Sequence, residues 1–198
     1  QQQLIDGCIT VQCETSTDEI HSVLQHAKQN DFIKGVVGWL DFTASNMEEQ
    51  LEYFSQFNLL KGFRHVVQAE PDERFLLRKD FCSGIAHLAR YNFTYDILIF
   101  PHQMPAAVEF VKLFPNQKFV LDHIAKPNIA KQEIDEWRKN IYALAACENV
   151  WCKLSGMVTE ANWHEWKQQD SVMVTFDIKD TASPYNVYFV MRHEDAYR

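Results

Sequence analysis

The 198-residue chain contains little glycine and proline, 6 residues of each, which excludes collagen-like and low-complexity proteins. It has no run of about 18 apolar residues that could span a bilayer. It also lacks the Gly-x-Gly-x-x-Gly and Gly-x-x-x-x-Gly-Lys loops that hold phosphates in open nucleotide-binding sheets. Lys and Arg number 19 against 27 Asp and Glu, a formal net charge of −8, so we expect no nucleic-acid partner.

The 5 cysteines are odd in number and include no Cys-x-x-Cys pair, which favours free thiols over disulfides or a zinc knuckle. Free thiols indicate a reducing compartment, and we expect a cytoplasmic location. The first residues show neither the charged nor the apolar region of a secretory leader. Because the chain begins with Gln1 and not with Met, we expect it to be a fragment of something longer.

Apolar runs alternate with amphipathic segments along most of the chain, and 46% of its residues are hydrophobic, enough for one sizeable core. The predicted strands are 8–11, 35–41, 63–68, 95–100, 118–122 and 150–154. The predicted helices are 18–29, 46–57, 75–91 with a break near residue 80, 105–114, 132–146 and 161–168. Ser16 with Glu19, and Asn46 with Glu49, have the spacing of helix-capping pairs.

Strands that recur every ~25 to 30 residues with helices between them indicate parallel pairing through crossovers. Without a phosphate loop, a barrel is favoured over an open sheet. A complete (β/α)8 barrel takes about 250 residues, whereas the six units here fill about 168. We therefore predict an α/β fold, an incomplete TIM barrel over residues 1–169. An open barrel piece exposes two strand edges, so we expect self-association through them.

Residues 170–198 have a different pattern. Alternating apolar residues at 172–178, a turn at 180–184 and a second apolar run at 186–191 predict a C-terminal β-hairpin. We place a domain boundary near residue 169.

Polar residues follow each predicted strand, where a parallel barrel carries its functional site. They are Gln12, Glu14, Asp41, Gln68, Glu70, His102, Gln103, Asp122, His123, Lys153 and Ser155. For the acids at 14, 41 and 70 the favoured interpretation is a solvated loop acid or a helix cap. The histidines at 21, 26, 87 and 164 fit surface or packing positions.

His123 ends an aliphatic strand and follows an acid. It fits a metal ligand, a general base or a structural, hydrogen-bonded histidine. Pro127 predicts an extended Lys126 over the rim of the barrel. Arg64 and His65 lie within one predicted strand, so only one of them faces the barrel interior. Arg64 fits either carboxylate recognition or a structural ion pair.

Four phrases in this order resemble the amidohydrolase-related TIM-barrel hydrolases: residues 32–41 (FIKGVVGWLD), 62–68 (GFRHVVQ), 119–127 (FVLDHIAKP) and 152–156 (CKLSG). They are most similar to the branch that contains fucono- and rhamnonolactonases and the pyrone dicarboxylate lactonase. The resemblance implies strands two to seven of the barrel. It also implies a hydrolase of carbohydrate catabolism that opens a sugar-acid or related lactone by water attack.

The resemblance assigns His123 as the catalytic histidine, in contact with the attacking water, the substrate carbonyl or a divalent, zinc-like metal. It implies substrate contacts from Arg64, His65, His102 and Gln12, and we add Lys126 to this set. The family also carries a His-x-His pair on its first strand and an Asp within Gly-Ser-Asp-Trp-Pro on its eighth. This sequence has neither, so we predict that the chain alone hydrolyses no lactone at a useful rate.

Residues 170–193 are similar to the start of gliding-motility-associated lipoproteins of gliding bacteria. This second resemblance implies that the tail has a different origin from the barrel. The alternative function is therefore a non-catalytic scaffold, or a fusion fragment with a cell-envelope tail.

Overall fold

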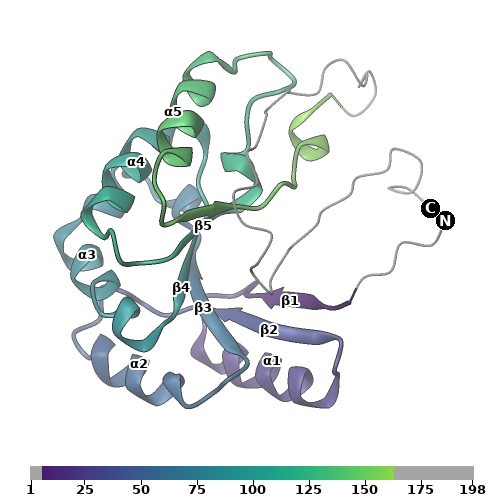
Figure 1. Cartoon of the computed structure of the whole chain (residues 1–198), viewed down its shortest axis with the longest axis vertical. Coiled ribbons are helices and arrows are strands. Elements are labelled where there is room, and N and C mark those ends of the chain that lie inside the picture. Colours follow the sequence, from purple (N-terminus) through teal and green to yellow (C-terminus); the bar gives the residue numbers. More distant parts are fainter. Residues whose placement is uncertain (1–5, 163–198) are drawn as a thin grey trace.

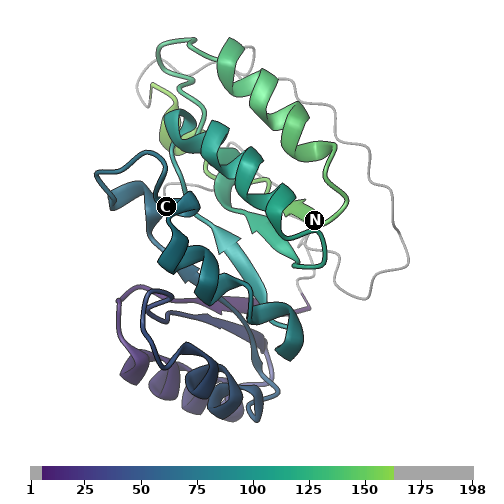
Figure 2. The same ribbon diagram turned by 90° about the vertical axis from the view of Figure 1, so that its left-hand side faces the viewer.

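The structure, a computed structural model, describes residues 6–162. Six strands form one sheet in chain order, and each pairs in parallel with the next. They are β1 (Cys8–Val11), β2 (Ile33–Gly38), β3 (Leu60–His65), β4 (Thr94–Ile97), β5 (Phe119–Leu121) and β6 (Val150–Cys152). The sheet curls, and the helices lie along its convex side (Figures 1 and 2). This arrangement confirms the predicted incomplete α/β barrel. The predicted hairpin and its boundary lie outside the described residues.

Five α-helices connect the strands: α1 (Thr17–Gln29), α2 (Met47–Ser55), α3 (Lys79–Ile85), α4 (Met104–Leu113) and α5 (Asp135–Ala145). Short 3-10 turns lie at Val67–Ala69, Phe75–Leu77, Leu88–Tyr91, Pro101–Gln103 and Val158–Glu160. A further short turn at Asp122–Ala125 contains residues with left-handed φ and ψ. The predicted helix over 75–91 is thus one short helix between two turns. Of the predicted helix 161–168, the described residues 161 and 162 are not helical, and the remainder lies outside the described part.

The two predicted capping pairs form only in part. Ser16 Oγ accepts the backbone N–H of Asp18 at 3.1 Å, as an N-cap does. The carboxylate of Glu19, however, accepts the N–H groups of Cys13 and Glu14, because the loop after β1 brings these otherwise unbonded donors to it. Asn46 makes no capping bond; its Oδ1 accepts from the Gln50 side chain instead.

The apolar core lies between the sheet and the helices. Phe63, Tyr95 and Phe119 are neighbours in register on β3, β4 and β5, and each has an exposed fraction of 0%. Tyr95 packs against Phe81 of α3 and Phe110 of α4, and Phe119 packs against Phe110. Because side chains alternate along a strand, the residues adjacent to these aromatics point to the concave side. The core therefore determines which polar side chains line the inside of the curl.

Within residues 6–162, no helix is long and apolar enough to cross a membrane. All 5 cysteines are free, as their odd number and spacing predict.

Candidate active site

Four charged side chains meet on the concave side of the sheet. Arg64 of β3 and Asp96 of β4 are partners in register, and Asp122 and Lys153 directly follow β5 and β6. Arg64 Nη1 donates to Asp122 Oδ2 at 2.9 Å. Lys153 Nζ lies 2.5 Å from Asp96 Oδ2 and 2.5 Å from Asp122 Oδ1. We call these four residues the charge network; it pairs two cations with two carboxylates.

Gln12, after β1, extends this arrangement to the first strand. Arg64 Nη2 donates to both its backbone oxygen, at 2.6 Å, and its Oε1, at 3.0 Å. The guanidinium thus joins the ends of β1, β3 and β5. Of the two roles that the sequence left open for Arg64, this geometry is that of an ion pair.

Burial governs the ionisation of the charge network. It raises the pKa of Asp96 to about 6, although Lys153 acts in the opposite direction. Burial alone would lower the pKa of Lys153, but the carboxylates of Asp96 and Asp122 outweigh it and raise this pKa above its ordinary value. The raised pKa favours the charged ammonium form of Lys153 in this network.

His123 stands next to this network at the end of β5. Its Nδ1 lies 2.8 Å from Ser155 Oγ, and within residues 6–162 its Nε2 makes no hydrogen bond. Burial lowers the pKa of His123, against the influence of Asp122, and the neighbouring cations lower it further. The ring is thus neutral at pH 7 and can accept a proton.

The backbone that carries His123 has an unusual conformation. Four consecutive residues, His123 to Lys126, have φ between 48° and 55°, in the left-handed region. The prediction that Pro127 holds Lys126 extended is wrong, since Lys126 has φ 48° and ψ 63°. Left-handed backbone costs about 1–2 kcal/mol per non-glycine residue, so this turn costs about 4–8 kcal/mol that its surroundings must offset.

Lys126 and His102 meet at the rim through one aromatic ring. Lys126 Nζ lies 5.5 Å from the centroid of the Phe100 ring, and His102 stacks on the same ring at 6.0 Å. His102 is exposed and Lys126 is half-buried. These two predicted substrate contacts therefore lie together, on the loops after β4 and β5.

His65 lies apart from them. Its side chain points to the helix side, where it stacks on Phe75 with ring centroids 5.1 Å apart. Nδ1 accepts the indole N–H of Trp39 at 3.1 Å, and Nε2 therefore donates to Glu70 at 2.6 Å. Arg64 and His65 thus face opposite sides, as strand alternation predicts.

Sequence reasoning missed Asp96 altogether and gave Lys153 no specific role. An acid within an otherwise apolar strand was the available signal for Asp96, because a buried carboxylate requires a cation. The sequence did not indicate which cation it was, since Lys153 is 57 residues away.

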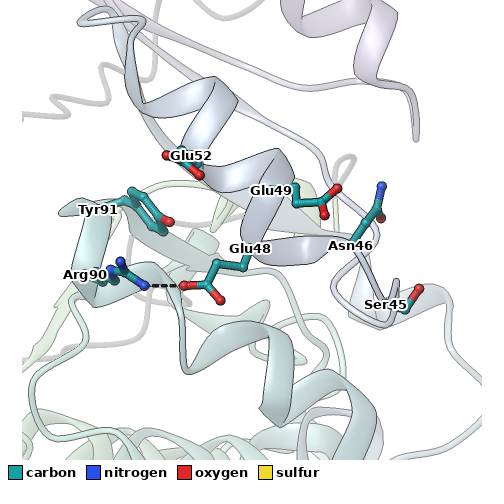
Figure 3. Close-up of a pocket in the computed structure, with 7 residues that line it drawn as sticks. All are labelled: Ser45, Asn46, Glu48, Glu49, Glu52, Arg90 and Tyr91. Atoms are coloured by element: carbon teal, nitrogen blue, oxygen red, sulfur yellow. Dashed lines mark hydrogen bonds and ion pairs between the residues drawn. The ribbon is translucent and has the colours of Figure 1, made fainter.

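A hollow of about 340 Å³ lies elsewhere, between α2 and the turn at Leu88–Tyr91 (Figure 3). It is lined by Ser45, Asn46, Glu48, Glu49, Glu52, Arg90 and Tyr91, and Arg90 pairs with Glu48 across it. It contains none of the residues at the strand ends discussed above.

Among the described residues, no three His, Cys, Asp or Glu side chains come together as a metal site would require. His123 is a single imidazole, and the nearby carboxylates of Asp96 and Asp122 are already paired with cations. The side chains within residues 6–162 therefore do not by themselves make up a metal centre.

Comparison with known proteins gives consistent matches. The family model described as amidohydrolase matches residues 9–189. The L-fucono-1,5-lactonase of Burkholderia multivorans is 37% identical over 167 residues, covering 81% of this chain and 56% of the lactonase. That of Burkholderia ambifaria is 29% identical over 160 residues, with 81% and 55% covered. The chain thus spans little more than half the length of these relatives.

Solved structures show the same likeness. An amidohydrolase from Burkholderia multivorans, crystallised with bound zinc, superposes with a TM-score of 0.78 at 35% identity, covering 84% of this chain and 60% of that one. A probable 2-pyrone-4,6-dicarboxylic acid hydrolase from Acinetobacter baumannii superposes with a TM-score of 0.64 at 15% identity, covering 79% and 57%. The second match supports the fold alone.

Proposed function

The chain belongs to the amidohydrolase family, and from that premise we propose that it is part of a hydrolase that opens a sugar-acid lactone by water attack. Two relatives named as L-fucono-1,5-lactonases support this substrate class. Family membership does not favour the alternative of a non-catalytic scaffold. The free cysteines support a cytoplasmic location as part of the proposal.

The observation that carries the proposal is the position of His123 at the strand end, with Nδ1 2.8 Å from Ser155 Oγ, which leaves Nε2 for a reacting group. Burial lowers the pKa of His123, which favours the neutral ring. In the proposed reaction Nε2 takes a proton from water, and the oxygen of that water adds to the lactone carbonyl carbon. The ring C–O bond then breaks, and the leaving oxygen receives the proton back from His123. The product is the open hydroxy acid.

Lys126 and His102 are the proposed substrate contacts at the rim. The ammonium of Lys126 stabilises negative charge that develops on the carbonyl oxygen or on a bound acid. Gln12 and Arg64 support the site through the charge network, and His65 acts from the helix side by holding the strand that carries Arg64.

The zinc bound in the Burkholderia multivorans structure raises the question of a divalent metal here. If this protein also binds one, His123 is the proposed ligand. Because the described residues do not make up a metal centre, we assign no step of the reaction to a metal.

Binding of the product acid tests the site directly. The 198-residue chain is titrated with the hydroxy acid of L-fucono-1,5-lactone, and the signals of His123, Ser155 and Lys126 are followed by NMR. We expect saturable shifts there, and an affinity about tenfold lower in Lys126→Met, because a charge-assisted contact is lost. Lys139→Met, at a side chain that is 75% exposed, is the matched control. Absence of saturable shifts at His123, or shifts confined to the hollow of Figure 3, would contradict the proposal.

A further inference from the structure

Trp137 of α5 contacts the turn that carries His123. Its side chain has an exposed fraction of 1%, and its indole N–H donates to the backbone oxygen of Ile124 at 2.7 Å. A buried indole N–H needs an acceptor, and this one lies in the left-handed turn next to the proposed base.

The two peptide groups that flank Ile124 are both anchored. The Ile124 N–H donates to the Lys153 oxygen at 3.2 Å, which fixes it to the end of β6. Its C=O is fixed to α5 by Trp137, and its side chain is 1% exposed. Since φ and ψ are the only soft backbone torsions, anchors on both sides of Ile124 also restrict the backbone from which the His123 side chain departs.

The His123 side chain is also contacted by the segment that follows β6. A Cβ at Gly156, which has φ +77°, would come within 2.9 Å of His123 Cβ, so the side chain lies directly against the glycine backbone. Ser155 bonds Nδ1. Contacts from two sides therefore offset the conformational cost of the left-handed turn. Trp137 supplies the contact on the α5 side.

We propose that Trp137 is a positioning residue for His123, which acts by holding the Ile124 carbonyl and with it the left-handed turn. This inference rests on the proposed function of His123 as the base. In this proposal, the buried Trp137 of α5 keeps His123 Nδ1 hydrogen-bonded to Ser155. His123 Nε2 then remains available to a reacting group. If the indole bond is lost, the turn relaxes and the ring leaves Ser155.

Trp137→Phe tests this, because it keeps an aromatic ring and removes the N–H. The readout is the ¹⁵N signature of the His123 ring nitrogens at fixed pH, together with the NOE between the ring and the Gly156 Hα protons. We expect the variant to lose the single-tautomer signature and this NOE. Both readouts are equilibrium properties of the ring, so they remain interpretable even if the chain binds no lactone or acid.

Gln117→Met is the matched control. Gln117 is 2% exposed and donates through Nε2 to the Phe93 and Lys118 oxygens, at the opposite end of β5. This variant also loses buried hydrogen bonds, but we expect its His123 signature to be that of the wild type. An unchanged His123 signature in Trp137→Phe, with a loss of stability like that of the control, would show a purely structural tryptophan and overturn the proposal.

If Trp137→Phe does not fold, the proposal can be tested on the wild-type chain. Protection of the Trp137 indole proton from exchange and the His123 signature are followed in rising urea, below the unfolding transition. The proposal requires both to be lost at the same urea concentration. Loss of indole protection while the His123 signature persists would overturn it.

Discussion

Arg64 and Asp122 form an ion pair of 2.9 Å, although 58 residues separate them along the chain. Asp122 is fully buried, and Lys153 is its second cationic partner. The pair connects β3 to the end of β5, and Lys153 adds the end of β6. Asp122 thereby fixes the peptide that leads into His123, the proposed base.

Asp122→Asn should cost about 3–5 kcal/mol in the free energy of unfolding, because it leaves two cations with only Asp96 to pair with. Urea denaturation followed by circular dichroism measures this. Asp135→Asn is the control, since that side chain is 94% exposed and pairs with Arg138 on the helix surface. Equal free energies of unfolding for the two variants would contradict a large contribution of the charge network to stability.

Asp96 should make stability fall as pH rises from about 4 to about 6. Its pKa is raised from 3.8 to about 6, so across this interval the folded chain binds a proton that the unfolded chain has released. The contribution of Asp96 is therefore greatest below pH 4 and is lost as pH passes 6. Urea midpoints from pH 4 to 7 should show this slope in the wild type and a flatter one in Asp96→Asn. An identical slope in the wild type and in Asp96→Asn would show that the pH dependence of stability comes from other groups.

Ala125→Gly should be tolerated, unlike glycine at a matched alanine. Both Ala125 and Ala107 have exposed fractions of 0%, but Ala125 has φ 55° and Ala107 is in α4. Glycine relieves the left-handed penalty at 125, which offsets the lost methyl group and the added chain entropy. We expect a change within about 1 kcal/mol there and a loss of about 2 kcal/mol for Ala107→Gly. The midpoints of thermal and urea unfolding measure the stability of both variants. Equal losses of stability in the two would contradict a left-handed turn at Ala125.

The chain should self-associate through its outermost strands. Within residues 6–162, β1 and β6 each pair on one side only, and they carry the exposed side chains of Ile9 (40%) and Trp151 (52%). Trp151→Lys should lower the average mass measured by light scattering at a given concentration, because charge on an edge strand opposes pairing. Tyr142→Lys, on an exposed position of α5, should not. A monomeric wild type would exclude association by these edges.

The chain alone should open L-fucono-1,5-lactone at the background rate. Its sequence contains no His-x-His pair and no Gly-Ser-Asp-Trp-Pro, so His123 is without the further groups that the family resemblance implies. Release of acid, followed with a pH indicator, measures this against a blank. Turnover above background that His123→Ala abolishes would contradict the prediction and support the role of His123.

The sequence by itself determined the alternation of strands and helices, since apolar periodicity is a local property that each segment carries. It also placed polar residues at the strand ends, and it followed from the two-residue repeat of a strand that Arg64 and His65 face opposite sides, although not which of them faces inward. Only the tertiary structure decided which charges pair, because Asp96 and Lys153 lie 57 residues apart and meet through the curl of the sheet.

The left-handed turn at His123 was likewise beyond the sequence. Local preference disfavours positive φ for His, Ile, Ala and Lys, and Pro127 favours an extended Lys126. Contacts with Trp137, Lys153 and Gly156, from other elements, offset that preference. The direction of the proposed base is therefore a property of the packed molecule, whereas the presence of a histidine at the end of that strand is a property of the sequence.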